Sequence, residues 1–98
     1  MAEVTIVYWR DIPAQVIVGR GRRGAKVVLP ERFEQAIDRA AMRAGARDTD
    51  AYLAEWRKVV IGEAAEAPEE VARQHAERLA AEYDDDRLKA LVMNAGWE

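Results

Sequence analysis

The chain has 98 residues, half of them hydrophobic and about a third charged, which allows one small domain with a modest core and excludes a substrate domain plus a cofactor domain. It contains no cysteine, so disulfides, thiolate zinc sites and cysteine nucleophiles are excluded. The formal net charge of -3 is unevenly distributed, because residues 1–58 carry eleven Lys/Arg against eight Asp/Glu, whereas residues 59–98 carry four against ten.

Three strands are predicted at the start of the chain. Residues 4–9 are β-branched and aromatic throughout, which suits a partly buried strand. Residues 10–13 break this strand with an aspartate and a proline, and residues 15–18 form the second strand. A loop with three glycines at residues 19–24 precedes the third strand at residues 26–29. The pattern predicts an antiparallel meander.

After Pro30 the hydrophobic period becomes helical. A first helix is predicted from Pro30 to a C-terminal cap at Gly45. A second is predicted from a cap at Asp48 or Thr49 to near Gly62. Its expected buried stripe consists of Tyr52 or Leu53, Trp56, Val59 and Val60.

Two further helices are predicted in the acidic part of the chain. The third begins at Pro68, with carboxylates in its first turn. Its inward-facing side chains are Val71, His75, Leu79 and Tyr83. Residues 84–86 are three aspartates that end this helix and cap a short fourth helix, and Trp97 follows in a tail.

Together these elements predict one α+β domain over residues 1–98, with strands within 3–29 and helices within 30–94. Three to four helices are expected to pack on one face of the three-stranded sheet. No charged leader precedes an apolar run, and no apolar segment approaches the roughly 18 residues that a membrane helix needs. We therefore expect a cytoplasmic protein without a membrane segment.

The residues of a catalytic site are missing. Acyl transfer needs an activated Ser, Cys or Thr, but the chain has no serine or cysteine, and only Thr5 and Thr49. The single histidine, His75, lies on a helical apolar stripe, where a structural role outweighs a catalytic one. The acidic clusters Glu69-Glu70 and Asp84-Asp85-Asp86 lack the ligand spacing of a calcium loop and suit helix caps instead. We predict no enzyme, no metal and no cofactor.

The glycine loop matches G-x-G-x-x-G at Gly19, Gly21 and Gly24. A dinucleotide-binding loop must open a helix, yet residues 25–29 are predicted to be a strand. A kinase-type glycine loop would need a catalytic lobe, for which this chain is too short. A Walker loop would need Ser or Thr at the position of Val27. All three nucleotide-binding interpretations are therefore weak.

What remains is a cationic hairpin beside an aromatic and charged turn. Guanidinium groups bind phosphates and carboxylates in a bidentate manner, and glycines allow a close approach of the backbone. The alternative interpretation of the hairpin loop is a solvated turn without a partner. The alternative interpretation of Trp9, Trp56 and Trp97 is that they pack in the core. The predicted partner-binding residues are Trp9, Arg10, Asp11, Gln15, Arg20, Arg22, Arg23 and Lys26.

Three segments carry a resemblance to a known family. They are Y-W-R-D-I-P-A-Q-V at residues 8–16, G-R-G-R-R-G-A-K at residues 19–26 and F-E-Q-A-I-D-R-A-A-M at residues 33–42, followed by Tyr52-Leu53 and Trp56. On these residues the chain resembles the bacterial virulence factor domain family, over about its first two-thirds. The first motif is specific, since it is not a generic pattern of a strand and a turn.

The resemblance implies an accessory or adaptor role. Similar domains occur as small stand-alone proteins in alphaproteobacteria and at one end of a longer staphylococcal protein with helical repeats. The genes of the stand-alone relatives lie near genes of folate- and corrinoid-linked methyl transfer. The resemblance therefore implies that the protein supports one-carbon or methionine metabolism. Our leading prediction is a non-enzymatic domain that binds another protein through the hairpin face. The alternatives are an RNA- or phosphate-binding module that uses the same cations, and a small protein whose chemistry resides in a bound cofactor such as a corrinoid.

Overall fold

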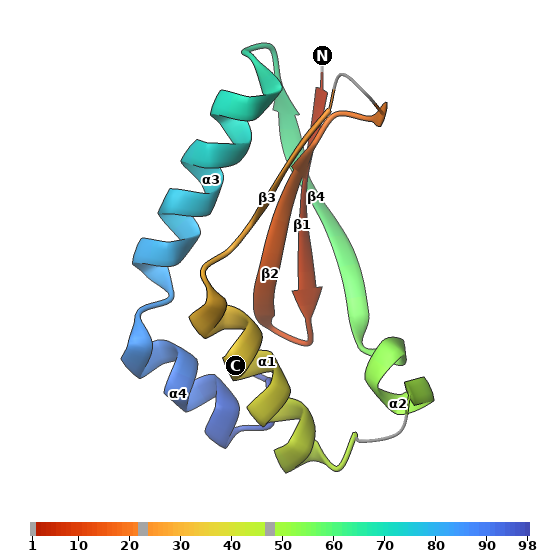
Figure 1. Ribbon diagram of the computed structural model, residues 1–98, viewed down its shortest axis with the longest axis vertical. Helices are drawn as coiled ribbons and strands as arrows, with labels where there is room; N and C mark the ends of the chain where they lie inside the picture. Colours follow the sequence, from red (N-terminus) through yellow and green to blue (C-terminus); the bar gives the residue numbers. More distant parts are fainter. Residues whose placement is uncertain (1, 22–23, 47–48) are drawn as a thin grey trace.

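The computed structural model describes residues 2–21, 24–46 and 49–98 (Figure 1). Its sheet contains β1 (Ala2–Trp9), β2 (Ile12–Val18), β3 (Ala25–Val28) and β4 (Trp56–Ala64) in the order β3-β2-β1-β4, with every neighbouring pair antiparallel. Its helices are α1 (Glu31–Ala44), α2 (Thr49–Ala54), α3 (Pro68–Glu82) and α4 (Asp85–Met93). The α+β class is confirmed, but the sheet has four strands where three were predicted.

The predicted meander forms β1, β2 and β3. A two-residue turn at Arg10 and Asp11 joins β1 to β2, as the sequence indicated. Strand β2 starts earlier than predicted and includes Pro13, which lacks an N–H for the ladder. The register shifts at this point, from Val7 opposite Gln15 to Tyr8 opposite Pro13. This irregularity is where a sheet tolerates proline.

The prediction of a second helix that reaches Gly62 is wrong. Helix α2 ends at Ala54, and Trp56–Ala64 forms β4, which pairs with β1 along its whole length. The apolar residues of this segment happen to recur at helical spacing. However, Val59, Val60 and Ile61 are consecutive β-branched residues, and β1 has a second edge whose backbone groups need partners. Pairing with β1 outweighs the helical pattern.

The other predicted helices are confirmed, and their ends have the expected caps. Gly45 adopts the left-handed conformation with φ 76° and donates its N–H back to α1. Pro68 opens α3. The Asp84 side chain accepts a 2.9 Å hydrogen bond from Arg87 N at the start of α4. Within the described residues, no helix is long and apolar enough to cross a membrane.

The side chain of Arg32 joins α1 to the end of α3. The two terminal nitrogens of Arg32 donate 2.5 Å hydrogen bonds to the carbonyl oxygens of Tyr83 and Ala80 at the end of α3. These carbonyls have no partners within their own helix, so Arg32 acts as a C-terminal cap supplied by another element. The guanidinium also lies 4.6 Å from the centre of the Phe33 ring.

The hydrophobic core lies between the helices and one face of the sheet. Side chains of a strand alternate between faces, and Val4, Ile6, Val16 and Val18 share the face that enters the core. Helix α3 packs over β2 and β3 on this side, as Figure 1 shows, while β4 lies away from it. Helix α3 therefore covers one face of the sheet. The opposite face is called the open face below.

Candidate functional site

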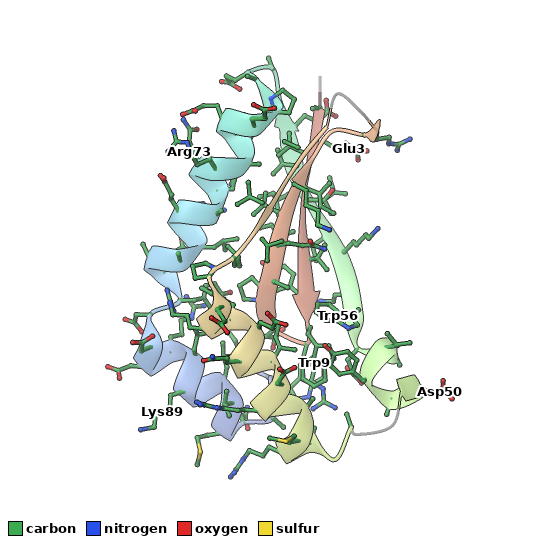
Figure 2. The ribbon with its side chains drawn as sticks, viewed as in Figure 1. Glu3, Trp9, Asp50, Trp56, Arg73 and Lys89 are labelled. Atoms are coloured by element: carbon green, nitrogen blue, oxygen red, sulfur yellow. The ribbon has the colours of Figure 1, made fainter. Side chains whose placement is uncertain are left out.

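Trp9 belongs to the core and offers no surface to a partner. Its side chain is 0 % exposed, and its ring stacks on Tyr52 with 5.9 Å between centroids. Its indole Nε1 donates a 2.9 Å hydrogen bond to the carbonyl oxygen of Tyr52. Figure 2 shows Trp9 at the end of β1 beside α2, close to Trp56. Its role is to dock α2 onto the sheet.

Arg10 is fixed in place on several sides. Its guanidinium carbon lies 5.1 Å from the Trp9 ring centre and 5.0 Å from that of Trp97, so the cation is packed between two indoles. One terminal nitrogen donates a 2.8 Å hydrogen bond to Ala95 O, and Nε lies 3.4 Å from Glu55 Oε2. Arg10 also has φ 54°, which is unfavourable for a residue with a side chain.

Asp11 completes this junction. Its carboxylate accepts a 3.2 Å hydrogen bond from Arg57 and a 2.8 Å hydrogen bond from the backbone N–H of Glu98. Its own N–H donates to Gly96 O at 2.8 Å. The turn is thereby joined to β4 and to the tail after α4. The W-R-D part of the motif therefore holds three segments together.

The glycines of the loop are explained by its geometry. Gly19 and Gly21 have φ 77° and 59°, a conformation that glycine adopts at little cost. A Cβ on Gly24 would lie 3.0 Å from both Arg20 N and Val18 O. Strand β3 follows the loop where a nucleotide fingerprint requires a helix, in agreement with the sequence analysis.

The arginines of the loop are only partly described. The Arg20 side chain is 92 % exposed and lies 3.4 Å from Glu3, an arrangement that contributes little in water. Arg22 and Arg23 lie outside the described residues. Strand β2 separates the loop from the turn at Arg10, and seven residues at about 3.3 Å each span roughly 20 Å. Of the described contact residues, Arg20 therefore lies at the opposite end of β2 from Arg10 and Asp11.

Gln15 and Lys26 lie between these ends, on the open face. The registers place two rows of side chains there, which are Lys26, Ile17, Thr5 and Val60 in one row and Val28, Gln15, Val7 and Lys58 in the other. Val28 is 66 % exposed and Val60 56 % exposed. Isolated apolar residues at a surface are ordinary, but these two lie on the same sheet face, opposite the face on which α3 packs.

A hollow of about 260 Å³ adjoins this face at its α1 end. Gln15 and Val28 of the open face form one side of it, and Tyr52 and Trp56 contribute aromatic rings that meet edge to face with 5.8 Å between centroids. Glu34 of α1 supplies a carboxylate at its rim. The hollow gives the face a concave end in which an apolar side chain of a partner fits.

Sequence reasoning found Gln15 and Lys26 but missed Val28, Lys58 and Val60. The sequence predicts a strand at residues 26–29 but does not indicate on which face of the sheet Val28 lies. It predicts Val60 on the buried stripe of a helix. Alternation in β2 and β3 could have revealed Val28. Alternation could not reveal β4, because its residues 57–63 are exposed on both faces and the pattern has no apolar side.

His75 has a structural environment. It is half-buried on α3, and Arg78 lies 3.1 Å from Nδ1, which must accept because a guanidinium has no lone pair to offer. Burial, and next the charge of Arg78, lower the pKa of His75 from its ordinary 6.5. Among the described residues, no group of three or more His, Cys, Asp or Glu side chains is placed to hold a metal ion.

The fold and this surface define a small α+β domain whose sheet has α3 on one face and exposed apolar and cationic side chains on the other. Residues 7–92 match the family model described as "Virulence factor", and the chain belongs to this family. The match extends through β4, α3 and most of α4, well beyond the part that carried the resemblance. No match was found among curated proteins or among solved structures.

Proposed function

We propose that this protein is a non-enzymatic accessory domain that binds a partner protein through the open face of its sheet. The observation that supports it is the exposure of Val28 and Val60 on the same sheet face, opposite α3. Lys26 and Lys58 lie in the same two rows, so the face combines apolar and cationic groups. A partner surface of apolar side chains bordered by carboxylates complements it.

The proposal keeps Gln15 and Lys26 from the predicted contact residues and gives the turn another role. Trp9 is buried, and Arg10 and Asp11 are occupied by contacts within the chain. They contribute by fixing the end of the sheet. The link to one-carbon or methionine metabolism stays a prediction that rests on the family resemblance.

The experiment compares two double variants with the same change in charge. Lys26→Glu/Val28→Glu alters the open face, whereas Arg39→Glu/Met42→Glu alters exposed residues of α1. Each purified variant is used to capture proteins from native lysate, after circular dichroism has shown that it is folded. Proteins lost with the open-face variant and retained with the α1 variant support the proposal. Identical capture by both variants rejects it.

An RNA- or phosphate-binding role is the second candidate, and the exposed Arg20 is the observation that favours it. Titration of the wild type with single-stranded RNA at several salt concentrations tests it. Phosphate contacts release counterions, so each one contributes about 0.7 to the slope of log affinity against log salt for a single strand. Binding that is absent, or independent of salt, contradicts this role.

A further inference from the structure

The outer edge of β4 is the least protected part of the sheet. The sheet has two edge strands, β3 and β4, and α3 packs along β3. Nothing comparable covers β4, where residues 57–63 are all exposed. Its centre holds Val59, Val60 and Ile61, which are 36 %, 56 % and 42 % exposed. Figure 1 shows the first part of β4, next to α2, at the side of the sheet remote from α3, whereas its end leads into α3.

The backbone of this edge is available for pairing. Strand β4 pairs with β1 alone, and in the described chain no further backbone hydrogen bond involves residues 56–64. Alternate N–H and C=O groups of an antiparallel strand point away from its neighbour. A nine-residue strand of this kind is a template for another strand. The question is which strand fits it.

A bulge in β4 restricts the possible registers. Thr5 pairs with Val60 and Val4 pairs with Gly62, so Ile61 is an extra residue. Before the bulge, Lys58 pairs with Val7 and lies on the open face. After it, Glu63 pairs with Glu3 and lies on the open face as well. Without the extra residue, Lys58 and Glu63 would lie on opposite faces.

The strand is complementary to itself in one register. Two antiparallel copies of β4 can align Lys58 of each with Glu63 of the other, and Val59 with Gly62, so that paired side chains share a face. The apolar pair Val60 and Ile61 then lies at the two-fold axis. Centring the pair on Val60 instead would align side chains from opposite faces. Neither Lys58 nor Glu63 has an ion-pair partner in the described part of the chain.

We propose that a second copy of this chain binds along β4, in antiparallel orientation, to form a continuous eight-stranded sheet. Two symmetry-related pairs of Lys58 with Glu63 flank a centre of Val60 and Ile61. Bulges and lysines in edge strands ordinarily prevent unspecific pairing with other strands. Here the bulge and Lys58 allow pairing in one register only. The inference goes beyond the partner proposed for the open face and does not rest on it.

Charge exchange provides the first test. Sedimentation velocity over a concentration series measures the dimer dissociation constant of the wild type, of Lys58→Glu and of Glu63→Lys. Each single variant places like charges opposite each other, and we expect its dissociation constant to rise by about tenfold or more. Mixing the two variants restores both pairs and should restore the wild-type constant.

Lys89→Glu and Glu66→Lys serve as matched controls, since they change the net charge equally at exposed positions outside the sheet (Figure 2 shows Lys89 on α4). They are expected to dimerise like the wild type. The proposal is overturned if the wild type is monomeric at every concentration, if the controls weaken it equally, or if mixing restores nothing. Circular dichroism shows that each variant is folded.

Cysteine pairing tests the register separately. The natural chain has no cysteine, so Lys58→Cys and Glu63→Cys introduce single reactive thiols. Directly opposed residues of two antiparallel strands lie about 4.5–5.5 Å apart, which suits a disulfide. A mixture should form the mixed dimer under mild oxidation faster than either variant alone forms its own dimer. Equal rates for all three would refute the proposed register.

Discussion

Replacing Arg10 with methionine should destabilise the protein strongly, although Arg10 lies in a surface turn. The change keeps an apolar stem and removes the guanidinium between Trp9 and Trp97. A hydrogen bond from a charged donor contributes about 1.5–3 kcal/mol, and each cation–π contact about 0.5–1 kcal/mol. Arginine and methionine lose a similar side-chain entropy when they are ordered, so this term largely cancels. We expect a net loss of about 2.5–5 kcal/mol.

Urea denaturation followed by tryptophan fluorescence measures the free energy of unfolding. The control is Arg20→Met, since Arg20 is 92 % exposed and its contact with Glu3 is worth at most about 1 kcal/mol. A comparison of Arg10→Gly with Arg10→Ala isolates the backbone, and glycine should be more stable by about 1 kcal/mol because φ is 54°. If Arg10→Met and Arg20→Met unfold at the same urea concentration, the junction has no energetic importance.

Three further changes test other parts of the structure. Gly96→Ala should cost about 2 kcal/mol or more in thermal unfolding, because φ is 96° and the new Cβ would lie 3.0 Å from the Trp9 ring; wild-type stability would contradict this. Asp84→Ala should cost about 1 kcal/mol through the lost cap of Arg87 N, whereas Asp84→Asn should retain most of it. The lowered pKa of His75 means that the unfolded chain binds the proton more readily, so stability should fall as the pH drops through 6.5. His75→Gln should flatten that part of the pH profile, and an unchanged profile would refute the assignment.

Most elements could be predicted because local signals agree with the tertiary structure. Proline and glycine mark the ends of α1, and three aspartates mark the start of α4. Strand β4 could not be predicted in this way. Its sequence is W-R-K-V-V-I-G-E-A, in which neither alternation nor a cap identifies a strand. Its conformation is set by the backbone groups of β1, which are distant in sequence and have no other partner on that side.

The candidate site shows a related limit. The specific motif at residues 8–16 contains aromatic and charged residues, which are the types enriched at interaction surfaces. Sequence alone does not distinguish an exposed arginine from one packed between two indoles, since both leave the same pattern. In this fold the Arg10 side chain is occupied by Ala95 and Glu55. The Asp11 carboxylate accepts hydrogen bonds from Arg57 and Glu98. Three distant segments meet at this motif. The side chains free for a partner, Val28 and Val60 above all, are chemically ordinary, and their interest comes from the sheet face on which the registers place them.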